Sequence, residues 1–439
     1  MSFIPHSEND TNQMLNDLDL NTFDDLFAHI PNELYLKTNI DIEESKSELE
    51  LIHYFNNLAS KNVNNLVCFA GGGHYDNYLP HTVKSLTMRP EFMTSYTPYQ
   101  SEISQGVLQA LFEYQSLVAD LTDMEMSNAS LYDGATSVVE AVSMSIVKTK
   151  RNKVLISEGI NKRALEALNT IIDTDSVMIK TLKYDSEFNH KNIQLNDDIA
   201  CVVFAVPTTH GSIQNYTQIN EYLHTLGIVS ICVVDPSILG IVKSPGEMGF
   251  DVVVAEGQSI GSALSFGGPT VGWFATKKEF ARLIPGRLIG ESRDTNGKRA
   301  YVMTLRAREQ DIRREKASSN ICTNQTLNAI GSAIHLSWLG PNGLKEIGYQ
   351  SMQKAHYLKD KLSKNFNLPL GDNFVREFIV DIQPRNSQEV IQRMSKKGFL
   401  AGIPVTYREN DYLLVSVTEK RTVDELDYYS DSLQEVVYG

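Results

Sequence analysis

The chain has 439 residues, of which 42% are hydrophobic and 21% charged, a balance typical of an ordinary globular protein with a sizeable core in two or three lobes. Its formal net charge of −14 opposes binding to nucleic acid, because the phosphate groups would be repelled. No apolar run approaches the roughly 20 residues needed to span a bilayer, and the polar, acidic start of the chain is unlike a secretory signal, so we expect no membrane partner.

The first 60 residues are predicted to form an N-terminal arm. Thr22 is a candidate helix N-cap with acidic residues in the turn that follows it, and Pro31 is expected to end that helix. An arm of this length could embrace a neighbouring subunit or pack on its own domain.

Four cysteines lie far apart in the sequence, at Cys68, Cys201, Cys232 and Cys322. They form no Cys-x-x-Cys motif and no cluster with histidine, so the sequence predicts no metal site. Three of them lie in apolar or strand-like surroundings. We therefore expect buried free thiols in a cytoplasmic protein.

Three consecutive glycines, from Gly71 to Gly73, precede His74 and Tyr75. Glycines at this density let the backbone approach a ligand or another chain closely, although a tight turn without a ligand explains them equally well. The spacing does not match a dinucleotide-binding fingerprint, and no strand-turn-helix pattern surrounds it.

The segment 89–140 combines a polar aromatic loop with two predicted helices. The loop carries hydroxyl and amide donors, and an amphipathic helix follows it. The donors are Tyr96, Thr97, Tyr99 and Gln100. A turn at Asp133-Gly134-Ala135-Thr136 then starts a second helix at about Thr136. Its free N–H groups and hydroxyl suit a phosphate or an oxyanion, but from the spacing alone an ordinary Asp-Gly turn with Thr136 as N-cap is the favoured interpretation.

The sequences TSYTPYQSEISQG, LQALFE and NASLYDGAT within this segment resemble the P-proteins (glycine decarboxylases) of the glycine cleavage system, and more narrowly the α chains of their two-chain form. FIPHSEND and DDLFAHIPNEL near the N-terminus show the same resemblance. In that family the GGG-x-Y-D motif lies around the active-site region. The resemblance therefore makes His74 a candidate pocket residue.

From residue 153 onward, short β-branched runs alternate with predicted helices, which indicates a largely parallel sheet covered on both faces. The predicted strands are 154–157, 200–206, 229–234 and 252–254. Ligands of such sheets gather at the carboxyl ends of the strands, where His210 and Asp235 lie. Each could be a simple strand-end residue. In the aminotransferase-like fold that the resemblance implies, an Asp in the position of Asp235 keeps the pyridine nitrogen of pyridoxal phosphate protonated.

Gln258 occupies the position at which catalytic chains of the family carry a lysine, counted back from the Gly267-Gly268-Pro269 turn. A Schiff base requires a primary amine, and a glutamine amide is not nucleophilic. We therefore expect this chain alone to form no covalent link with pyridoxal phosphate.

An arginine-rich run at 306–316 lies in an otherwise acidic protein and also resembles the family. It could be a solvated helix face with i,i+4 ion pairs. Alternatively, Arg313 could close the mouth of a partner's pocket, where phosphate and carboxylate groups need cations.

The resemblance covers essentially the whole chain and implies a pyridoxal-phosphate-dependent transferase-like α/β fold. We expect an arm at 1–60, a large α/β domain at 61–319 and a small C-terminal α/β domain at 320–439. In the small domain, strands 374–382 and 412–417 and helices 387–396 and 423–438 are predicted, after a break at Gly340-Pro341.

The resemblance further implies an α₂β₂ assembly in which the β subunit holds pyridoxal phosphate. The assembly decarboxylates glycine and passes the aminomethyl group to the lipoyl arm of the H-protein. Tyr96, Thr97, Tyr99 and Gln100 could face the partner's cofactor or simply pack at the subunit boundary. Two alternatives remain: an inert regulatory or scaffold protein of the same fold, and an enzyme that acts alone on pyridoxal phosphate.

Overall fold

The computed structural model describes residues 5–36, 40–63, 65–93, 96–183 and 195–439, and it divides into two units, residues 1–64 and 65–439. The first unit contains α1 (Glu8–Asp17), the 3₁₀-helix η1 (Phe23–Phe27) and α2 (Glu48–Ala59). Thr22 precedes η1 as predicted, and its backbone N–H donates to the carboxylate of Asp25 at 2.7 Å. The element is a single 3₁₀ turn rather than an α-helix.

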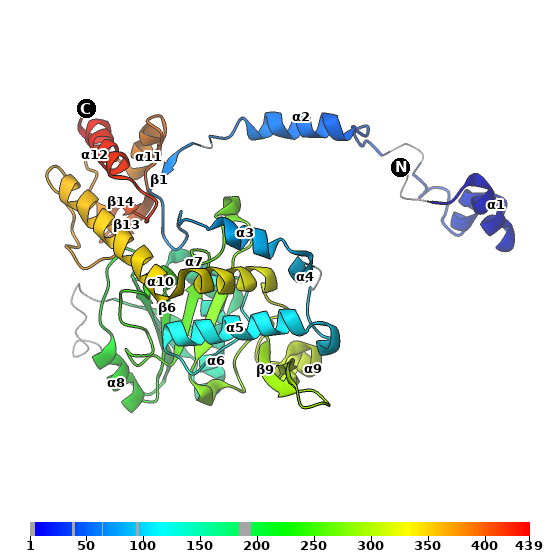
Figure 1. Ribbon diagram of the computed structural model, residues 1–439, viewed down its shortest axis with the longest axis horizontal. Coiled ribbons are helices and arrows are strands. Elements are labelled where there is room, and N and C mark those ends of the chain that lie inside the picture. Colours follow the sequence, from blue (N-terminus) through cyan, green and yellow to red (C-terminus); the bar gives the residue numbers. More distant parts are fainter. Residues whose placement is uncertain (1–4, 37–39, 64, 94–95, 184–194) are drawn as a thin grey trace. The chain divides into compact units, whose positions relative to one another are not determined.

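A seven-stranded sheet forms the centre of the second unit (Figure 1). Among these seven strands β8 alone runs against the others, as the predicted largely parallel sheet requires. In spatial order the strands are β2 (Met126–Ser127), β8 (Gly272–Thr276), β7 (Val252–Glu256), β6 (Val229–Val234), β5 (Ile199–Val206), β3 (Lys153–Ser157) and β4 (Met178–Leu182). All four predicted strands are present, as β3, β5, β6 and β7.

Side-chain alternation along the strands divides the core into two layers. In β5, Val202 and Phe204 pack in one hydrophobic cluster, and Cys201 and Val203 pack in another. Helices α5 and α10 cover the first face and helices α6 and α7 the second (Figure 1). Their bounds are α5 (Gln105–Thr122), α6 (Gly134–Thr149), α7 (Lys162–Ile171) and α10 (Thr326–Leu362). Because both faces are covered, the strands carry apolar residues on both sides.

A smaller antiparallel sheet, in the order β11-β14-β13, lies near the C-terminus. Its strands are β11 (Glu377–Val380), β14 (Asn410–Ser416) and β13 (Ile403–Tyr407), and it is accompanied by α11 (Ser387–Ser395) and α12 (Val423–Tyr438). The sequence did not predict β13. Phe69, at the start of the second unit, is buried in the core of this part against Phe399 and Tyr429. The domain boundary at residue 320 stays a prediction, since α10 contacts α5 as well as α12.

The break expected at Gly340-Pro341 is present as a kink between two helical parts of α10, with non-helical backbone angles at Gly340. Gly340 has φ +58°, a left-handed conformation that glycine adopts without strain, and Pro341 cannot donate the next helical hydrogen bond. The helix resumes beyond this point. One pair of residues therefore redirects α10 from the large sheet towards the C-terminal core.

The expectation that all four cysteines are buried is wrong. Cys201 and Cys232 are buried in strands, Cys68 is partly exposed and Cys322 is exposed. Cys322 follows the arginine-rich run, where no apolar strand surrounds it.

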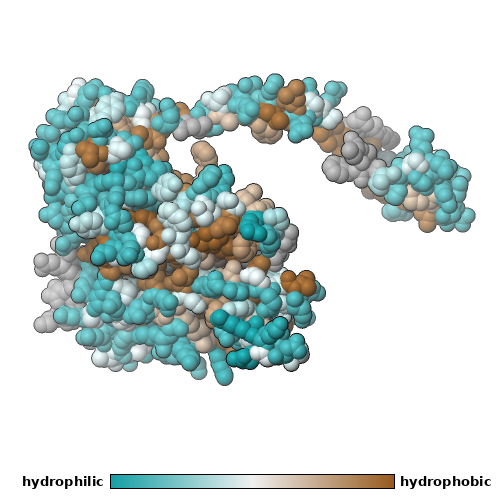
Figure 2. Space-filling model, viewed as in Figure 1, coloured by the Kyte–Doolittle hydropathy of each residue, from teal (hydrophilic) through white to brown (hydrophobic). Residues whose placement is uncertain are grey.

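The surface of the second unit carries both hydrophilic and hydrophobic areas. Figure 2 shows hydrophobic residues gathered over α3 (His81–Thr87) and the first half of α10. Exposed apolar side chains in and near these helices include Met88, Met93 and Trp338. Within the described part of the chain, no helix is both long and apolar enough to cross a membrane.

Candidate functional site

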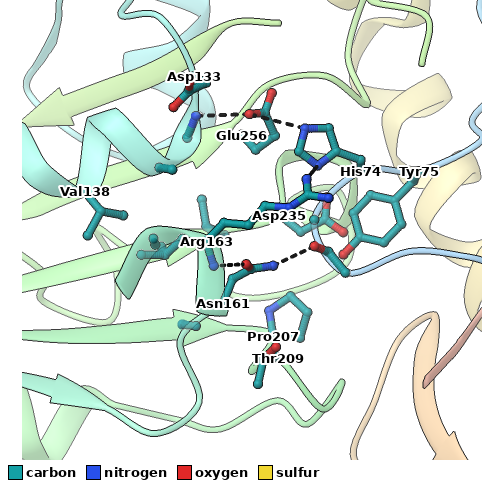
Figure 3. A pocket seen from close by; sticks show the side chains of 18 of the residues that line it. His74, Tyr75, Asp133, Val138, Asn161, Arg163, Pro207, Thr209, Asp235 and Glu256 are labelled. Carbon is teal, nitrogen blue, oxygen red and sulfur yellow. Dashed lines mark hydrogen bonds and ion pairs between the residues drawn. The ribbon is translucent and has the colours of Figure 1, made fainter. Parts of the chain in front are cut away.

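A cavity of about 320 Å³ opens at the carboxyl ends of the central strands, beside the first turn of α6 (Figure 3). Glu256 at the end of β7, Asp235 directly after β6 and the loop at 71–75 meet apolar residues of α6 and α7 at this point. The position is the one expected for a ligand of a parallel α/β sheet, where strand ends and helix starts converge. Predicted residues His74 and Asp235 line it, and Thr136 does not.

Asp133 and Thr136 together cap α6. The carboxylate of Asp133 accepts a hydrogen bond from the N–H of Thr136 at 2.7 Å, and the hydroxyl of Thr136 lies 3.0 Å from the same oxygen. The interpretation of Thr136 as N-cap is therefore wrong: Asp133 is the N-cap, and Thr136 is the third helical residue of a capping box. The hydroxyl of Thr136 is occupied locally rather than directed at a ligand.

Glu256, the last residue of β7, occupies the remaining free end of this helix. One carboxylate oxygen accepts the N–H of Gly134 at 3.0 Å, and the other accepts the N–H of Gln258 at 3.0 Å. Burial raises the pKa of the Glu256 carboxyl to about 7, although these hydrogen bonds oppose the shift. Two N–H groups in the first turn of α6, those of Gly134 and Thr136, are thus already bound by the chain's own acids.

Gln258 is 2% exposed and points away from the cavity, towards the backbone of Tyr75. Its amide oxygen accepts the N–H of Tyr75 at 2.8 Å, and its amide nitrogen donates to the carbonyl of Tyr75 at 3.2 Å. The nitrogen also donates to the carbonyl of Ser262 at 3.1 Å. The side chain therefore ties two loops together, which is a structural role.

Asp235 forms an ion pair with Arg376 at 2.5 Å, and both side chains are almost completely buried. The guanidinium of Arg376 lies 3.4 Å from the centre of the Tyr75 ring. The hydroxyl of Tyr75 in turn donates to Glu377 at 2.8 Å. Asp235 thus has an internal cation as its partner.

Glu377 explains part of the glycine run. Its carboxylate accepts the N–H of Gly72 at 2.6 Å, and a side chain at Gly71 would collide with the same carboxylate. Burial raises the pKa of Glu377. The glycines therefore let the backbone wrap around a buried acid.

His74 lies between two charged groups in Figure 3. Its Nδ1 is 3.2 Å from the guanidinium of Arg163, and its Nε2 is 3.7 Å from the carboxylate of Glu256. Burial, followed by the charge of Arg163, lowers the pKa of His74, so the ring is neutral at pH 7. Arg163 is held in turn by Asn161, which accepts its backbone N–H at 2.8 Å.

The other predicted site residues lie elsewhere. His210 lines a second cavity, where its Nε2 lies 3.1 Å from the carbonyl of Thr406. The predicted loop residues Tyr96, Thr97, Tyr99 and Gln100 line neither cavity, and Arg313 is exposed in the short helix α9 (Gln310–Arg313).

Sequence reasoning missed Glu256, Arg376 and Glu377. An acid at the end of a buried strand and a charged pair within the apolar run 374–382 were the available signals. Among the described residues, no group of three potential metal ligands is close enough to hold an ion.

These residues do not fit pyridoxal phosphate. Gln258 offers no amine, Glu256 takes the N–H of Gly134 that a phosphate would need, and Arg376 already neutralises Asp235. Four carboxyl groups line the cavity, those of Asp133, Asp235, Glu256 and Glu377. Two guanidinium groups oppose them, Arg163 on the wall and Arg376 behind Asp235. A phosphate at the start of α6 would therefore meet the carboxyl group of Glu256, whose pKa burial raises to about 7.

Comparison with known proteins gives a consistent result over the full chain. Residues 1–433 match the family model of the glycine cleavage system P-protein. Proteins named probable glycine dehydrogenase (decarboxylating) subunit 1, from Chlorobium phaeobacteroides and Geobacillus thermodenitrificans, are each 41% identical to it. The aligned regions cover 99% of both chains for the first and 98% for the second.

Solved structures show the same relationship. A crystal structure of glycine decarboxylase (P-protein) of the glycine cleavage system, in inhibitor-bound form, superposes with a TM-score of 0.93 at 36% identity, over 99% of this chain and 100% of that one. A sphingosine-1-phosphate lyase from Burkholderia pseudomallei, 11% identical over 92% of this chain and 93% of its own, has a TM-score of 0.65 and shares the fold alone. The predicted pyridoxal-phosphate-dependent transferase-like fold is confirmed, and the chain belongs to the glycine cleavage system P-protein family.

Proposed function

We propose that this chain is the α subunit of a two-chain glycine decarboxylase. With a β subunit it would release CO₂ from glycine and pass the aminomethyl group to the lipoyl arm of the H-protein. Relatives that match over almost their whole length are named subunit 1, which supports a division of the enzyme between two chains.

The observation that carries this proposal is the cavity beside Glu256, with the amide of Gln258 next to it. The cavity has the position of a cofactor site in this fold, yet Gln258 offers no amine and the carboxylate of Glu256 already accepts the N–H of Gly134. A family member with such a cavity needs a second chain to hold pyridoxal phosphate, which supplies the electron sink for decarboxylation. We therefore assign the cofactor to the β subunit of an α₂β₂ assembly.

The loop that carries Tyr96 and Tyr99 would be the part of this chain that contributes to the active site of the β subunit. The hydroxyl of Tyr99 accepts a hydrogen bond from Arg287 at 2.8 Å, and Arg306 lies over the same ring at 5.3 Å. Arg287 is buried and also donates to the carbonyl of Cys322 at 2.7 Å. These contacts hold the loop in place while Tyr96 stays 77% exposed.

An exposed tyrosine on an anchored loop is suited to a subunit interface, because its ring buries a large area and its hydroxyl can still donate a hydrogen bond. Thr97 contacts Thr323 at 3.5 Å, while Gln100 is exposed beside the tyrosines. Arg313 is exposed and stays a candidate cation for anionic groups in the partner's site.

Co-expression with the β subunit tests the proposal. We expect a stable complex with equal amounts of both chains, and exchange of CO₂ with the carboxyl group of glycine by the complex but not by this chain alone. Exchange by the isolated chain would instead identify a self-sufficient enzyme. A β subunit that is fully active without this chain would favour the inert scaffold.

Replacement of Tyr96 separates a contribution to the partner's site from simple assembly. We expect Tyr96→Ala to lower the exchange activity of the complex about tenfold or more, which corresponds to roughly 1.4 kcal/mol. Tyr349→Ala, at another exposed tyrosine, is the matched control and should leave activity unchanged. An intact complex with full activity after Tyr96→Ala would contradict this role for the loop.

A further inference from the structure

The side chain of Phe266 stands almost entirely in solvent. At 97% exposed, it is the most exposed large hydrophobic side chain among the described residues. It lies in the 3₁₀ turn η5 (Ser265–Gly267), on the loop between β7 and β8. A phenylalanine ring is stabilised when it leaves water, so this position is unfavourable for the chain on its own.

The backbone at Phe266 is strained as well. Its φ is +50° and its ψ is +38°, which is the left-handed region, and Ser265 before it has φ +45°. Gly267 follows in the same region at φ +82°. Glycine adopts this conformation readily, whereas a bulky residue does so at a cost. Strain of this kind persists where the surrounding structure enforces it, and it is found preferentially at functional sites.

Hydrogen bonds fix both ends of the loop. On one side, the carbonyl of Ile260 accepts the hydroxyl of Ser332 at 2.6 Å. On the other side, the amide of Asn328 donates to the carbonyl of Thr270 at 2.8 Å. Phe266 therefore projects from an anchored loop. Pre-organised aromatic side chains of this kind contribute much of the binding energy at protein interfaces.

The start of α10 connects this loop with the loop that carries Tyr96 and Tyr99. Asn328, in the first turn of α10, holds the loop of Phe266. The hydroxyl of Thr323, just before the helix, lies 3.5 Å from that of Thr97. The two loops thus belong to one continuous surface, which the proposed function directs towards the β subunit.

The same surface is apolar where α3 and α10 meet the loop. A Cβ at Gly331 of α10 would lie 3.1 Å from the carbonyl of Gly261 and 3.5 Å from the side chain of Thr87, at the end of α3. Hydrophobic residues gather over these two helices in Figure 2. The exposed apolar side chains near this point include Met88, Leu264 and Leu327. A contiguous apolar area, unlike scattered single residues, marks a surface for another protein.

We propose that Phe266 is an anchor that inserts into an apolar socket on the β subunit when the two chains assemble. Burial of its ring in the complex would offset the exposure and the strain that the isolated chain sustains. The inference rests on the proposed function for the identity of the partner. The continuity with the loop of Tyr96 and Tyr99 favours the β subunit over a second copy of this chain.

Titration calorimetry of the full chain with the β subunit tests the anchor. We expect Phe266→Ala to weaken binding about tenfold or more, and Phe266→Leu, which keeps an apolar side chain, to weaken it less. Tyr428→Ala, at an aromatic side chain 55% exposed on α12, is the matched control and should leave the affinity unchanged. Equal affinities of wild type and Phe266→Ala would overturn the proposal.

Phe266→Gly separates backbone strain from binding. Glycine adopts φ +50° without strain, so the melting temperature of the isolated variant should equal or exceed that of wild type, although binding weakens as in Phe266→Ala. A clearly lower melting temperature would show that Phe266 stabilises its own chain, which contradicts an anchor for a partner.

Two further measurements identify the occupant and separate this inference from the proposed function. Sedimentation of the isolated chain should give the same oligomeric state for wild type and Phe266→Ala. Loss of self-association in the variant would assign the anchor to a second copy and refute the socket on the β subunit. A wild-type complex without glycine–CO₂ exchange, whose affinity still falls in Phe266→Ala, would contradict the proposed function and support the anchor.

Discussion

The carboxylate of Glu256 lies 3.0 Å from the backbone nitrogen of Gly134 and accepts its hydrogen bond. The start of a helix in this position is an anion-binding site, because its free N–H groups and dipole favour negative charge. Here the anion is the chain's own side chain. An element suited to a phosphate has become a structural contact between α6 and β7.

The raised pKa of Glu256 predicts a specific dependence of stability on pH. The pKa is about 7 in the folded protein and near 4.5 in an unfolded chain, so the folded state binds more protons between these values. This group therefore lowers the free energy of unfolding as pH rises from about 4.5 to 7, by up to roughly 3 kcal/mol at about 1.4 kcal/mol per pH unit. Denaturant unfolding of wild type and Glu256→Gln at pH 5, 6, 7 and 8 measures this loss of stability. We expect the free energy of unfolding of the variant to exceed that of wild type by an amount that grows with pH. The same pH dependence in both proteins would contradict the assignment.

Gly134 permits the contact with Glu256 by having no side chain. A Cβ at this position would lie 2.8 Å from both the Cβ and the backbone nitrogen of Glu256, so Gly134→Ala should separate α6 from β7. We expect a loss of about 1–3 kcal/mol in the free energy of unfolding. Gly106→Ala, in the first turn of α5 with no atom near its Cβ, should instead be neutral or stabilise by up to about 1 kcal/mol. Equal thermal shifts of the two variants would rule out the proposed close contact.

The strands of the large sheet could be predicted from sequence because each is marked by a short run of neighbouring residues. Continuous apolar runs such as 200–206 identify buried strands, and Asp235 after such a run marks the edge where ligands gather. These predictions needed no knowledge of distant contacts. That Gln258 takes the place of a lysine came from the resemblance to the family and stays a prediction.

The rest of the site depends on pairing between distant segments. Arg376 meets Asp235, and Glu377 meets Gly72, only after the C-terminal sheet has packed beside the large one. No local pattern predicts these partners. For the same reason the sequence did not show that the N–H of Thr136 donates to Asp133, or that the N–H of Gly134 donates to Glu256.

The ion pair between Asp235 and Arg376 predicts strong coupling between the two positions. Arg376→Met leaves a buried carboxylate without its cation, so we expect a loss of about 3–5 kcal/mol in stability. In the double variant with Asp235→Asn, the second change removes that charge and should restore part of the loss. A double-mutant cycle from denaturant unfolding measures the coupling. Simple additivity of the two effects would show that the pair is not energetically linked.

Gln258→Lys tests whether the missing amine alone prevents covalent binding of pyridoxal phosphate. The lysine would lose the hydrogen bonds to Tyr75 and would enter a buried position, which lowers the pKa of its amine and destabilises the fold. The phosphate would still meet Glu256 at the N–H of Gly134. We therefore expect a lower melting temperature and no covalent adduct after borohydride reduction, measured by mass spectrometry of the intact chain. Gln258→Met, similar in volume but without an amine, is the control and should show a comparable loss of stability. Stoichiometric labelling of the lysine variant would mean that the contact between Glu256 and Gly134 does not exclude the cofactor, and that the amine was all that this cavity lacked.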